Sequence, residues 1–297
     1  MNKKVSIILP CLNEWKRIFH NIEFLNLYLE KYLTNMNYEF ILVNDGSTDN
    51  TKDEIERLAQ KYSFVETINY RVNMWKGFAI NQWLQKANGE IIVFYDSDLD
   101  IEPDSLVKHI LYLEKNKKYS IVIWSKVHGK SKIRYSLKRK IISKFNIYLN
   151  KILFWLPVKD TQTWLKVFRK ELKNTFLENI KIFWYAFDIE FLYHIYKKNY
   201  KIKELPVRVN LSSSSSVNFL SIINYLKEVV IFHKKISFIV SRKKITFITK
   251  LKLLLIKSIV FPIENGVNFI LYILMDSSFR KGNLWKEKSR FVKQKLY

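Results

Sequence analysis

The strongest constraint on the fold of this chain is an alternation of short apolar runs with amphipathic segments over residues 5–124. The apolar runs are rich in β-branched residues and have the length of strands, whereas the segments between them repeat apolar residues every three or four positions, as helices do. The predicted strands are residues 5–9, 40–43, 65–69, 91–95 and 120–124, and the predicted helices are residues 14–33, 50–62, 77–86 and 103–116. This order predicts an α/β fold with a doubly wound, mostly parallel sheet that is covered by helices on both faces.

Short polar motifs follow four of the predicted strands, at the edge where a doubly wound sheet binds its ligands. They are Pro10-Cys11-Leu12-Asn13-Glu14, Asn44-Asp45-Gly46-Ser47-Thr48-Asp49, residues 71–77 and Asp96-Ser97-Asp98. Each motif alone is typical of an ordinary turn or helix cap. Because parallel strands end at one edge of a sheet, the four motifs together predict a single binding site.

Asp96 and Asp98 are the predicted metal ligands of this site. They follow the apolar strand 91–95, so a rigid element supports both carboxylates. Carboxylate oxygens are hard ligands, and they suit Mg²⁺ or Mn²⁺ that holds a diphosphate through the oxygens of the substrate. The alternative interpretation is a pair of solvated aspartates in a loop.

Positive charge is concentrated in the second part of the chain. The net charge is +24, but residues 1–120 carry 15 basic and 17 acidic residues, so residues 121–297 carry the whole excess. Such a surface attracts the phosphate groups of a substrate, an anionic lipid or a nucleic acid. We do not expect nucleic acid as a partner, because the basic region carries no nucleic-acid-binding motif and alternates with long apolar faces.

The cysteine content and the first residues indicate the setting of the chain. Cys11 is the single cysteine, which excludes an internal disulfide and favours a reducing compartment. The first apolar run ends at Pro10 and is too short for a signal peptide, so we interpret it as a strand.

The pattern changes after residue 125. Residues 126–157 are basic and helical in pattern, residues 158–168 and 202–209 predict strands, and residues 188–198 predict a helix. A run of serines at 212–216 predicts a linker, so the expected domains are residues 1–212 and 213–297.

The expected second domain is a region of basic amphipathic helices. Its apolar faces are interrupted by lysines, and no run reaches the roughly 18 apolar residues of a membrane span. Such helices are typical of segments that lie in the interface of an anionic membrane surface. The alternatives are a helical cap on the soluble core and a hairpin that enters the bilayer near Pro262.

Three of the motifs carry a resemblance to a known family. Pro-x-x-Asn-Glu, Asn-Asp-Gly-Ser-Thr-Asp and Asp-x-Asp, over about residues 4–125, resemble those of the family 2 inverting glycosyltransferases, which have the GT-A fold. Residues 160–168, 185–190 and 204–207 are similar to segments of dolichyl-phosphate β-glucosyltransferases and their bacterial polyprenyl-phosphate relatives. The resemblance covers roughly residues 4–210.

The resemblance implies roles for individual residues. Pro10, Asn13 and Glu14 would line the nucleotide pocket, Asn44 and Asp45 would hold the base or ribose, and Lys76 would approach the pyrophosphate. Asp96 and Asp98 would hold the metal, with Asp98 as the more direct ligand. Arg134 and Arg139 would bind the acceptor phosphate, which suits the bidentate guanidinium group. The acceptor side would include Asp160, Gln162, Asp188 and Glu190.

The function that the resemblance implies is transfer of a hexose, glucose or mannose, from a UDP- or GDP-sugar to a polyprenyl phosphate of the dolichyl type. The enzyme would act at the cytoplasmic face of the cell membrane, bound peripherally or inserted in the interface. The alternative is transfer to a sugar hydroxyl in the synthesis of a cell-surface polysaccharide. A hydroxyl acceptor would need a general base, for which Asp188 is the candidate, whereas a phosphate monoester with a second pKa near ~6 is already a nucleophile at pH 7.

Four positions depart from the family pattern. Asn44 stands where the family more often has Asp, and Trp75, Trp124 and Trp164 stand where it has Gly. The chain has 6 Gly and 8 Trp, so one hypothesis is that some of these tryptophans are glycines of a recoded genome. The alternative is a diverged site, which includes a protein that binds a nucleotide-sugar without turnover.

Overall fold

The computed structural model describes residues 3–74, 76–133, 137–163, 165–179 and 186–209, together with residues 225–226, 228–229, 231–233 and 236. The chain divides into two compact units, Met1–Ser216 and Val217–Tyr297. All helices and strands named below belong to the first unit. The predicted basic helices of residues 213–297 lie almost entirely outside the described residues. Within the described part of the chain, no helix combines the length and the apolar character that crossing a bilayer requires.

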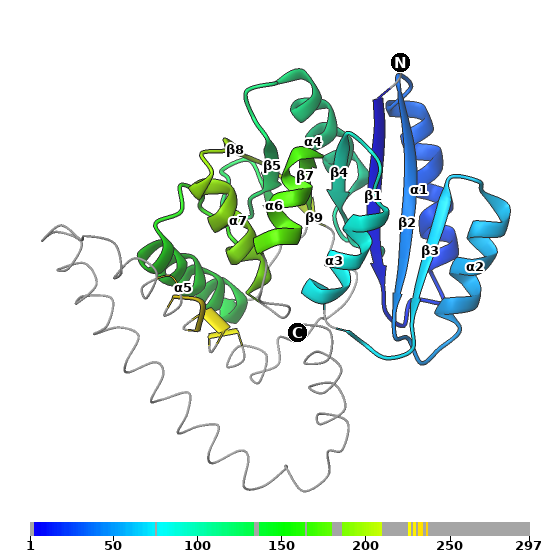
Figure 1. Cartoon of the computed structure of the whole chain (residues 1–297), viewed down its shortest axis with the longest axis horizontal. Coiled ribbons are helices and arrows are strands. Elements are labelled where there is room, and N and C mark those ends of the chain that lie inside the picture. Colours follow the sequence, from blue (N-terminus) through cyan, green and yellow to red (C-terminus); the bar gives the residue numbers. More distant parts are fainter. Residues whose placement is uncertain are drawn as a thin grey trace, which may run out of the picture. The chain divides into compact units, whose positions relative to one another are not determined.

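A seven-stranded sheet is the centre of the first unit (Figure 1). Its strand order is β3-β2-β1-β4-β7-β5-β8. All neighbours are parallel except β7, which runs antiparallel to both β4 and β5. The strands are β1 (Lys3–Cys11), β2 (Met36–Asp45), β3 (Val65–Tyr70), β4 (Ile91–Phe94), β5 (Ile121–Trp124), β7 (Lys166–Arg169) and β8 (Ile202–Leu205). A separate parallel pair consists of β6 (Lys132–Ile133) and β9 (Arg208–Val209).

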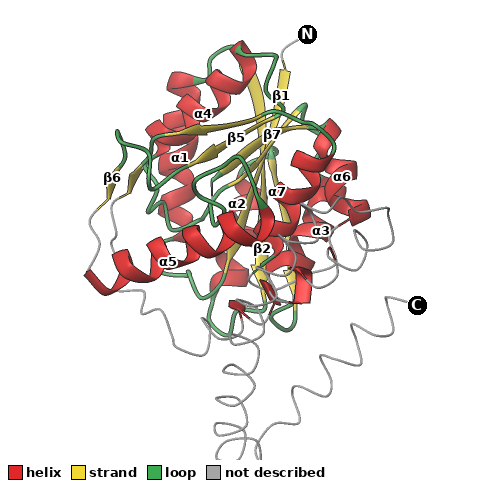
Figure 2. Ribbon diagram, turned by 90° about the vertical axis from the view of Figure 1, so that its left-hand side faces the viewer, coloured by secondary structure: helices red, strands yellow, loops and turns green. Residues whose placement is uncertain are grey.

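Helices cover both faces of the sheet (Figure 2). The helices are α1 (Ile18–Tyr32), α2 (Thr51–Lys61), α3 (Lys76–Lys86), α4 (Pro103–Lys115), α5 (Leu137–Phe154), α6 (Glu171–Asn179) and α7 (Phe187–Lys197). Helix α1 contacts both α2 and α4 on one face, and α6 contacts both α3 and α7 on the other. The described elements therefore form the three-layer α/β arrangement that the sequence predicts.

Burial in the apolar core explains why the central strands are nearly continuous apolar runs in the sequence. Alternate residues of a strand point to opposite faces, and both faces of this sheet are buried. Ile7 and Leu9 of β1 pack with the layer of α1, α2 and α4. On the other face the rings of Phe94, Phe168, Phe176 and Phe191 form one cluster, in which neighbouring rings have centroid distances of 4.9–6.0 Å.

A buried polar cluster closes the amino-terminal edge of the sheet. The carboxylate of Glu39 pairs with the Lys4 ammonium and accepts hydrogen bonds from Ser6 Oγ at 2.5 Å and from the Asn88 N–H at 3.2 Å. Burial opposes ionisation of Glu39, but the hydrogen bonds from Lys4, Ser6 and Asn88 outweigh it and lower the pKa of this carboxyl. The charge of Glu39 is therefore balanced, and its oxygens are hydrogen-bonded, by residues at this edge of the sheet itself.

The elements predicted for residues 5–124 are present, and the differences among the described residues fall after residue 125. The predicted strand 158–168 is short, because the Lys159 and Asp160 N–H groups both bind Glu204 Oε1 at 3.0 Å instead of a neighbouring strand. The predicted strand 202–209 is divided into β8 and β9 at Pro206, which lacks a backbone donor. Helix α6 was not predicted, and α5 accounts for only the second half of the region 126–157.

Candidate active site

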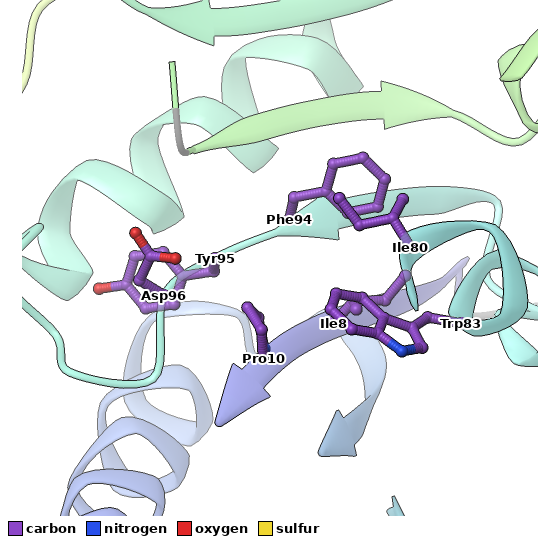
Figure 3. A pocket seen from close by; sticks show the side chains of 7 residues that line it. All are labelled: Ile8, Pro10, Ile80, Trp83, Phe94, Tyr95 and Asp96. Carbon is purple, nitrogen blue, oxygen red and sulfur yellow. The ribbon is translucent and has the colours of Figure 1, made fainter. Parts of the chain in front are cut away.

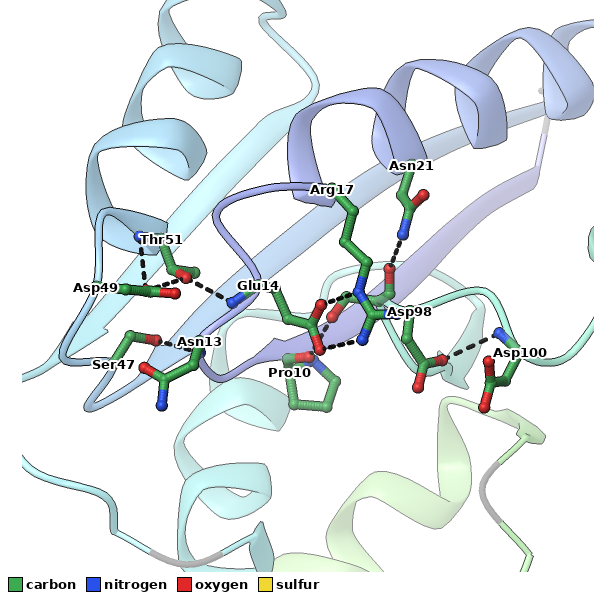
Figure 4. Close-up of polar contacts among 11 residues, drawn as sticks. Pro10, Asn13, Glu14, Arg17, Asn21, Ser47, Asp49, Thr51, Asp98 and Asp100 are labelled. Carbon is green, nitrogen blue, oxygen red and sulfur yellow. Dashed lines mark hydrogen bonds and ion pairs between the residues drawn. The ribbon is translucent and has the colours of Figure 1, made fainter. Parts of the chain in front are cut away.

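The loops after β1 and β2 are joined by side-chain hydrogen bonds (Figure 4). Asn13 has a positive φ of 56°, its N–H donates to Ser47 Oγ at 3.0 Å, and its Oδ1 accepts from the Thr48 N–H at 2.9 Å. The Glu14 N–H donates to Thr51 Oγ1 at 2.7 Å. The predicted nucleotide residues Asn13 and Glu14 are therefore held by the motif that follows β2.

The loop after β2 is in turn tied to the segment after β3. Asp45 Oδ1 accepts the Met74 N–H at 2.9 Å, and a Cβ on Gly46, which has a φ of 75°, would lie 2.2 Å from the Asn73 nitrogen. Asn44 Oδ1 accepts the Ser47 N–H at 3.0 Å. Asn44 therefore forms the turn through a side-chain oxygen, which the commoner Asp also offers at this position.

The acidic motif follows β4 at the point where the strand order reverses, between β1 and β4. Ser97 Oγ donates to the Pro10 carbonyl at 2.8 Å, and Asp98 Oδ1 accepts the Asp100 N–H at 3.0 Å (Figure 4). Burial, together with the charge of Asp96, raises the pKa of Asp98 to about 6. The two predicted ligands are therefore close enough for the charge of Asp96 to oppose ionisation of Asp98.

Asp96 also lines a small pocket beneath the edge of the sheet (Figure 3). The pocket has an empty volume of about 200 Å³ including its mouth, and Asp96 is its one charged lining residue. The other lining residues are Ile8, Pro10, Ile80, Trp83, Phe94 and Tyr95. The predicted metal ligand and the predicted nucleotide residue Pro10 thus share one pocket.

The first turns of α1 supply two site residues that the sequence analysis missed. Arg17 Nη2 donates to Glu14 Oε1 at 2.8 Å, and Asn21 Nδ2 donates to the Ser97 carbonyl at 2.9 Å. The bond to Glu14 raises the pKa of Arg17 against its partial burial, and the charges of Asp98 and Asp100 add to this effect. The i, i+4 spacing of Arg17 and Asn21 places both on one face of the predicted helix, which is the signal that could have found them.

The donor set of Asp96 and Asp98 fits a divalent cation. The opposition between their charges is what a dication relieves. Two carboxylates are also the usual protein share of a Mg²⁺ site in which phosphate and water complete the shell. Among the described residues no group of three or more His, Cys, Asp or Glu side chains is arranged to hold a metal.

Asp160, predicted for the acceptor side, is engaged by its own chain. Its side chain is buried, Oδ2 accepts the Lys126 N–H at 3.0 Å, and Oδ1 lies 3.4 Å from Lys126 Nζ. Oδ1 also accepts the Gln162 N–H at 3.3 Å. Burial raises the pKa of Asp160, against the opposing effect of Lys126. These contacts position the loop that carries Gln162, and contact of Asp160 or Gln162 with an acceptor stays a prediction.

Asp188, the candidate base for a hydroxyl acceptor, lies in the first turn of α7. Its Oδ1 lies 2.5 Å from Nζ of the buried Lys166, which the sequence analysis did not select. Lys166 is the first residue of β7 and is paired in register with Phe94, two residues before Asp96. The antiparallel course of β7 thus brings Asp188 to the edge of the sheet where β4 ends.

Three predicted basic residues are not placed by their side chains. Lys76 begins α3 and Arg139 lies in α5, but the structure describes only their backbone, and Arg134 lies outside the described residues. Their phosphate-binding roles stay predictions.

Of the three unusual tryptophans, Trp124 lies within the described residues. It ends β5, is buried, and its Nε1 has no hydrogen-bond partner in that part of the chain. Trp75 and Trp164 lie outside the described residues.

The sheet order, the acidic motif after β4 and the linked loops define a class of protein. The sequence profile of glycosyl transferase family 2 matches residues 6–188. The chain therefore belongs to glycosyl transferase family 2, and it is a glycosyltransferase of the GT-A fold.

The relatives and structural neighbours refine this assignment. A dolichyl-phosphate beta-glucosyltransferase of Trichomonas vaginalis is 30% identical over 241 residues, covering 77% of this chain and 74% of the relative. The mannosyltransferase PcManGT from Pyrobaculum calidifontis, solved with GDP-Man and Mn²⁺, aligns with a TM-score of 0.54 at 16% identity, covering 100% of this chain and 80% of the neighbour. Glucosyl-3-phosphoglycerate synthase from Mycobacterium tuberculosis, solved with Mn²⁺, UDP-glucose and phosphoglyceric acid, aligns with a TM-score of 0.52 at 14% identity, covering 76% and 80%.

Proposed function

We propose that this glycosyltransferase moves glucose from UDP-glucose to a polyprenyl phosphate of the dolichyl type. The observation that carries the proposal is the 30% identity, over 77% of this chain, to a relative whose name states the acceptor and the sugar. The donor is proposed from the sugar and from the UDP-glucose bound by one structural neighbour.

The donor would bind over the linked loops after β1, β2 and β3. Asn44 and Asp45 would face the base or ribose, with Pro10, Asn13 and Glu14 lining the pocket, and Lys76 would approach the pyrophosphate. Asp96 and Asp98 would hold Mg²⁺ or Mn²⁺, which as a Lewis acid stabilises the departing diphosphate when bound. Asn21 and Ser97 fix the backbone between these carboxylates, so the donor meets a preorganised site.

The acceptor phosphate would attack the anomeric carbon directly. A phosphate monoester is mostly a dianion at pH 7, because its second pKa is near ~6, and so it needs positioning more than a general base. Arg134 and Arg139 are the proposed positioning groups, since guanidinium binds phosphate in a bidentate manner. Attack on one face as the diphosphate leaves from the other would invert the anomeric configuration.

The second domain is proposed to bring the enzyme to its lipid substrate. Residues 213–297 contain the amphipathic segments rich in lysine, and an anionic membrane surface attracts such segments. Peripheral or interfacial binding at the cytoplasmic face would give the site access to the phosphate of the lipid while the donor arrives from the aqueous phase.

The proposed function is tested by incubating the full chain with labelled UDP-glucose, GDP-mannose or UDP-N-acetylglucosamine. Dolichyl phosphate or undecaprenyl phosphate is offered as acceptor, with Mg²⁺, Mn²⁺ or EDTA. We expect a glucosyl phosphate lipid, identified by mass spectrometry, from UDP-glucose in the presence of metal. Transfer only to an oligosaccharide hydroxyl, supplied in a parallel reaction, would contradict the proposal.

A further inference from the structure

Lys166 is an unusual residue for the centre of a sheet. The residue is 1% exposed, because β7 is flanked by β4 and β5 in the middle of the sheet. An ammonium group is seldom buried this deeply without a counter-charge, because removing it from water is unfavourable. A specific partner must therefore hold this charge.

The partner is Asp188. Its Oδ1 lies 2.5 Å from Lys166 Nζ, and the two side chains are 9% and 2% exposed. The ammonium also donates to the Thr163 carbonyl and lies 5.6 Å from the centre of the Phe187 ring. Three neighbours thus fix the ammonium, and the ammonium fixes Asp188 at the first turn of α7.

The Lys166–Asp188 pair lies near the carboxylates of the proposed site. Lys166 is in register with Phe94, so the pair lies at the same edge of the sheet as Asp96 and Asp98. An acceptor phosphate that enters this edge meets carboxylates that repel it, and each like charge at short range in a partly buried site weakens its binding. A neutralised Asp188 removes one of these repulsions.

We propose that Lys166 is a positioning residue that fixes Asp188 and cancels its charge, so that the acceptor side of the site accepts an anionic substrate. The inference rests on the proposed function, because it presumes a phosphate acceptor. It extends that function by assigning to the Lys166–Asp188 pair a part in selecting phosphate over hydroxyl acceptors. A hydroxyl acceptor would instead require Asp188 as the base that takes a proton.

The test compares Lys166→Met, Asp188→Asn and the double variant, with initial rates measured against dolichyl phosphate and against UDP-glucose. Lys166→Met keeps the length of the side chain and leaves the carboxylate uncompensated. We expect it to raise KM for dolichyl phosphate about tenfold while KM for UDP-glucose stays within about twofold. The double variant removes both charges, and we expect it to return KM for dolichyl phosphate to within about threefold of the wild-type value.

Lys4→Met is the matched control, because Lys4 also pairs with a buried carboxylate, that of Glu39, but at the opposite edge of the sheet. We expect it to lower the melting temperature and leave both KM values unchanged. If Lys166→Met changes both KM values alike, or neither, as the control does, the pair is merely structural and the inference is wrong.

The double variant decides the question if Lys166→Met does not fold, since it leaves no uncompensated buried charge. A kcat within about tenfold of the wild type supports the inference, and a larger loss overturns it by showing that Asp188 acts as a base. The wild type separates the two proposals. If the wild type does not use dolichyl phosphate, the proposed function is rejected and this inference with it. If the wild type does transfer glucose to dolichyl phosphate but the variants contradict the expectation, only the inference is rejected.

Discussion

The two edges of the sheet differ in how their charges are balanced. At the amino-terminal edge, Glu39 is surrounded by donors that lower its pKa. At the carboxyl edge, burial and the charge of Asp96 raise the pKa of Asp98 to about 6. At one edge the carboxylate is balanced by neighbouring donors and stabilises the fold. At the other edge two carboxylates oppose each other, and a bound cation would balance them.

The carboxyl edge also contains residues with an unusual backbone conformation. Asn13, Gly46 and Leu99 have positive φ, at 56°, 75° and 57°, and lie in loops at this edge, whereas Trp155 and Asn199, at 54° and 62°, lie in other loops. Such conformations are unfavourable for residues other than glycine and persist where the surroundings enforce them, commonly at ligand sites. The carboxyl edge therefore holds both strain and unbalanced charge, as a binding site would.

The largest expected effect comes from removing the charge of Asp98. Asp98→Asn should lower the transfer rate by about a thousandfold or more, because the cation that stabilises the leaving diphosphate loses a ligand. The melting temperature should stay the same or rise, since repulsion with Asp96 is relieved. EDTA should reproduce the loss in the wild type. Retention of a tenth of the activity, measured with saturating Mn²⁺, would remove Asp98 from the proposed site.

A smaller effect is expected from Asn21, which holds the loop without touching a substrate. Asn21→Leu removes the bond to the Ser97 carbonyl and should weaken Mn²⁺ binding about tenfold, in the range typical of residues that orient metal ligands. Electron paramagnetic resonance of free Mn²⁺, measured in the presence of UDP, reports this affinity without turnover. Unchanged affinity would show that the acidic loop holds its shape without α1.

At the amino-terminal edge, a substitution should change stability and leave the transfer rate unaltered. Glu39→Gln should lower the free energy of unfolding by about 2 kcal/mol, because charge-assisted hydrogen bonds from Lys4 and Ser6 are lost. The transfer rate per folded molecule should not change. Glu23→Gln, which breaks the exposed pair with Lys61, is the control and should alter stability little. Denaturant unfolding together with activity assays measures both quantities.

The contribution of Glu39 should also depend on pH in a defined direction. Its folded-state pKa is lowered from the ordinary value of 4.5, so the unfolded chain takes up a proton first as the pH falls. The stabilisation is fully present above 4.5 and is lost as the pH falls through the lower folded-state value. The stability difference between wild type and Glu39→Gln should therefore shrink below pH 4.5. A difference that grows with acidity would contradict this account.

The identity of residues 75, 124 and 164 can be tested without any variant. Peptide mass spectrometry of native protein should find glycine at 75, 124 and 164 if the tryptophans arise from recoding. Tryptophan at these positions would reject the hypothesis.

The sequence was sufficient for the fold of residues 5–124 because each of its signals is local. Apolar runs, helical periodicity and the motif at 96–98 all lie within short windows, and parallel strands bring them to one edge. The fold after residue 125 depends on contacts between distant residues. Lys166 had no sequence signal, since its partner Asp188 is brought near only by the antiparallel course of β7. Likewise, the strand predicted from residue 158 is replaced by backbone bonds to Glu204.

The reversed direction of β7 has a consequence for how such a protein can diversify. The chain leaves the sheet after Trp124 and returns at Lys166, and because β5 and β7 are antiparallel, departure and return occur at the same edge. The excursion between them can lengthen, shorten or change its composition without shifting the register of either strand. Under the proposed function, in which this excursion carries residues of the acceptor side, new acceptors could be acquired in evolution by changes in one contiguous stretch of the gene, while the proposed donor site is inherited unaltered.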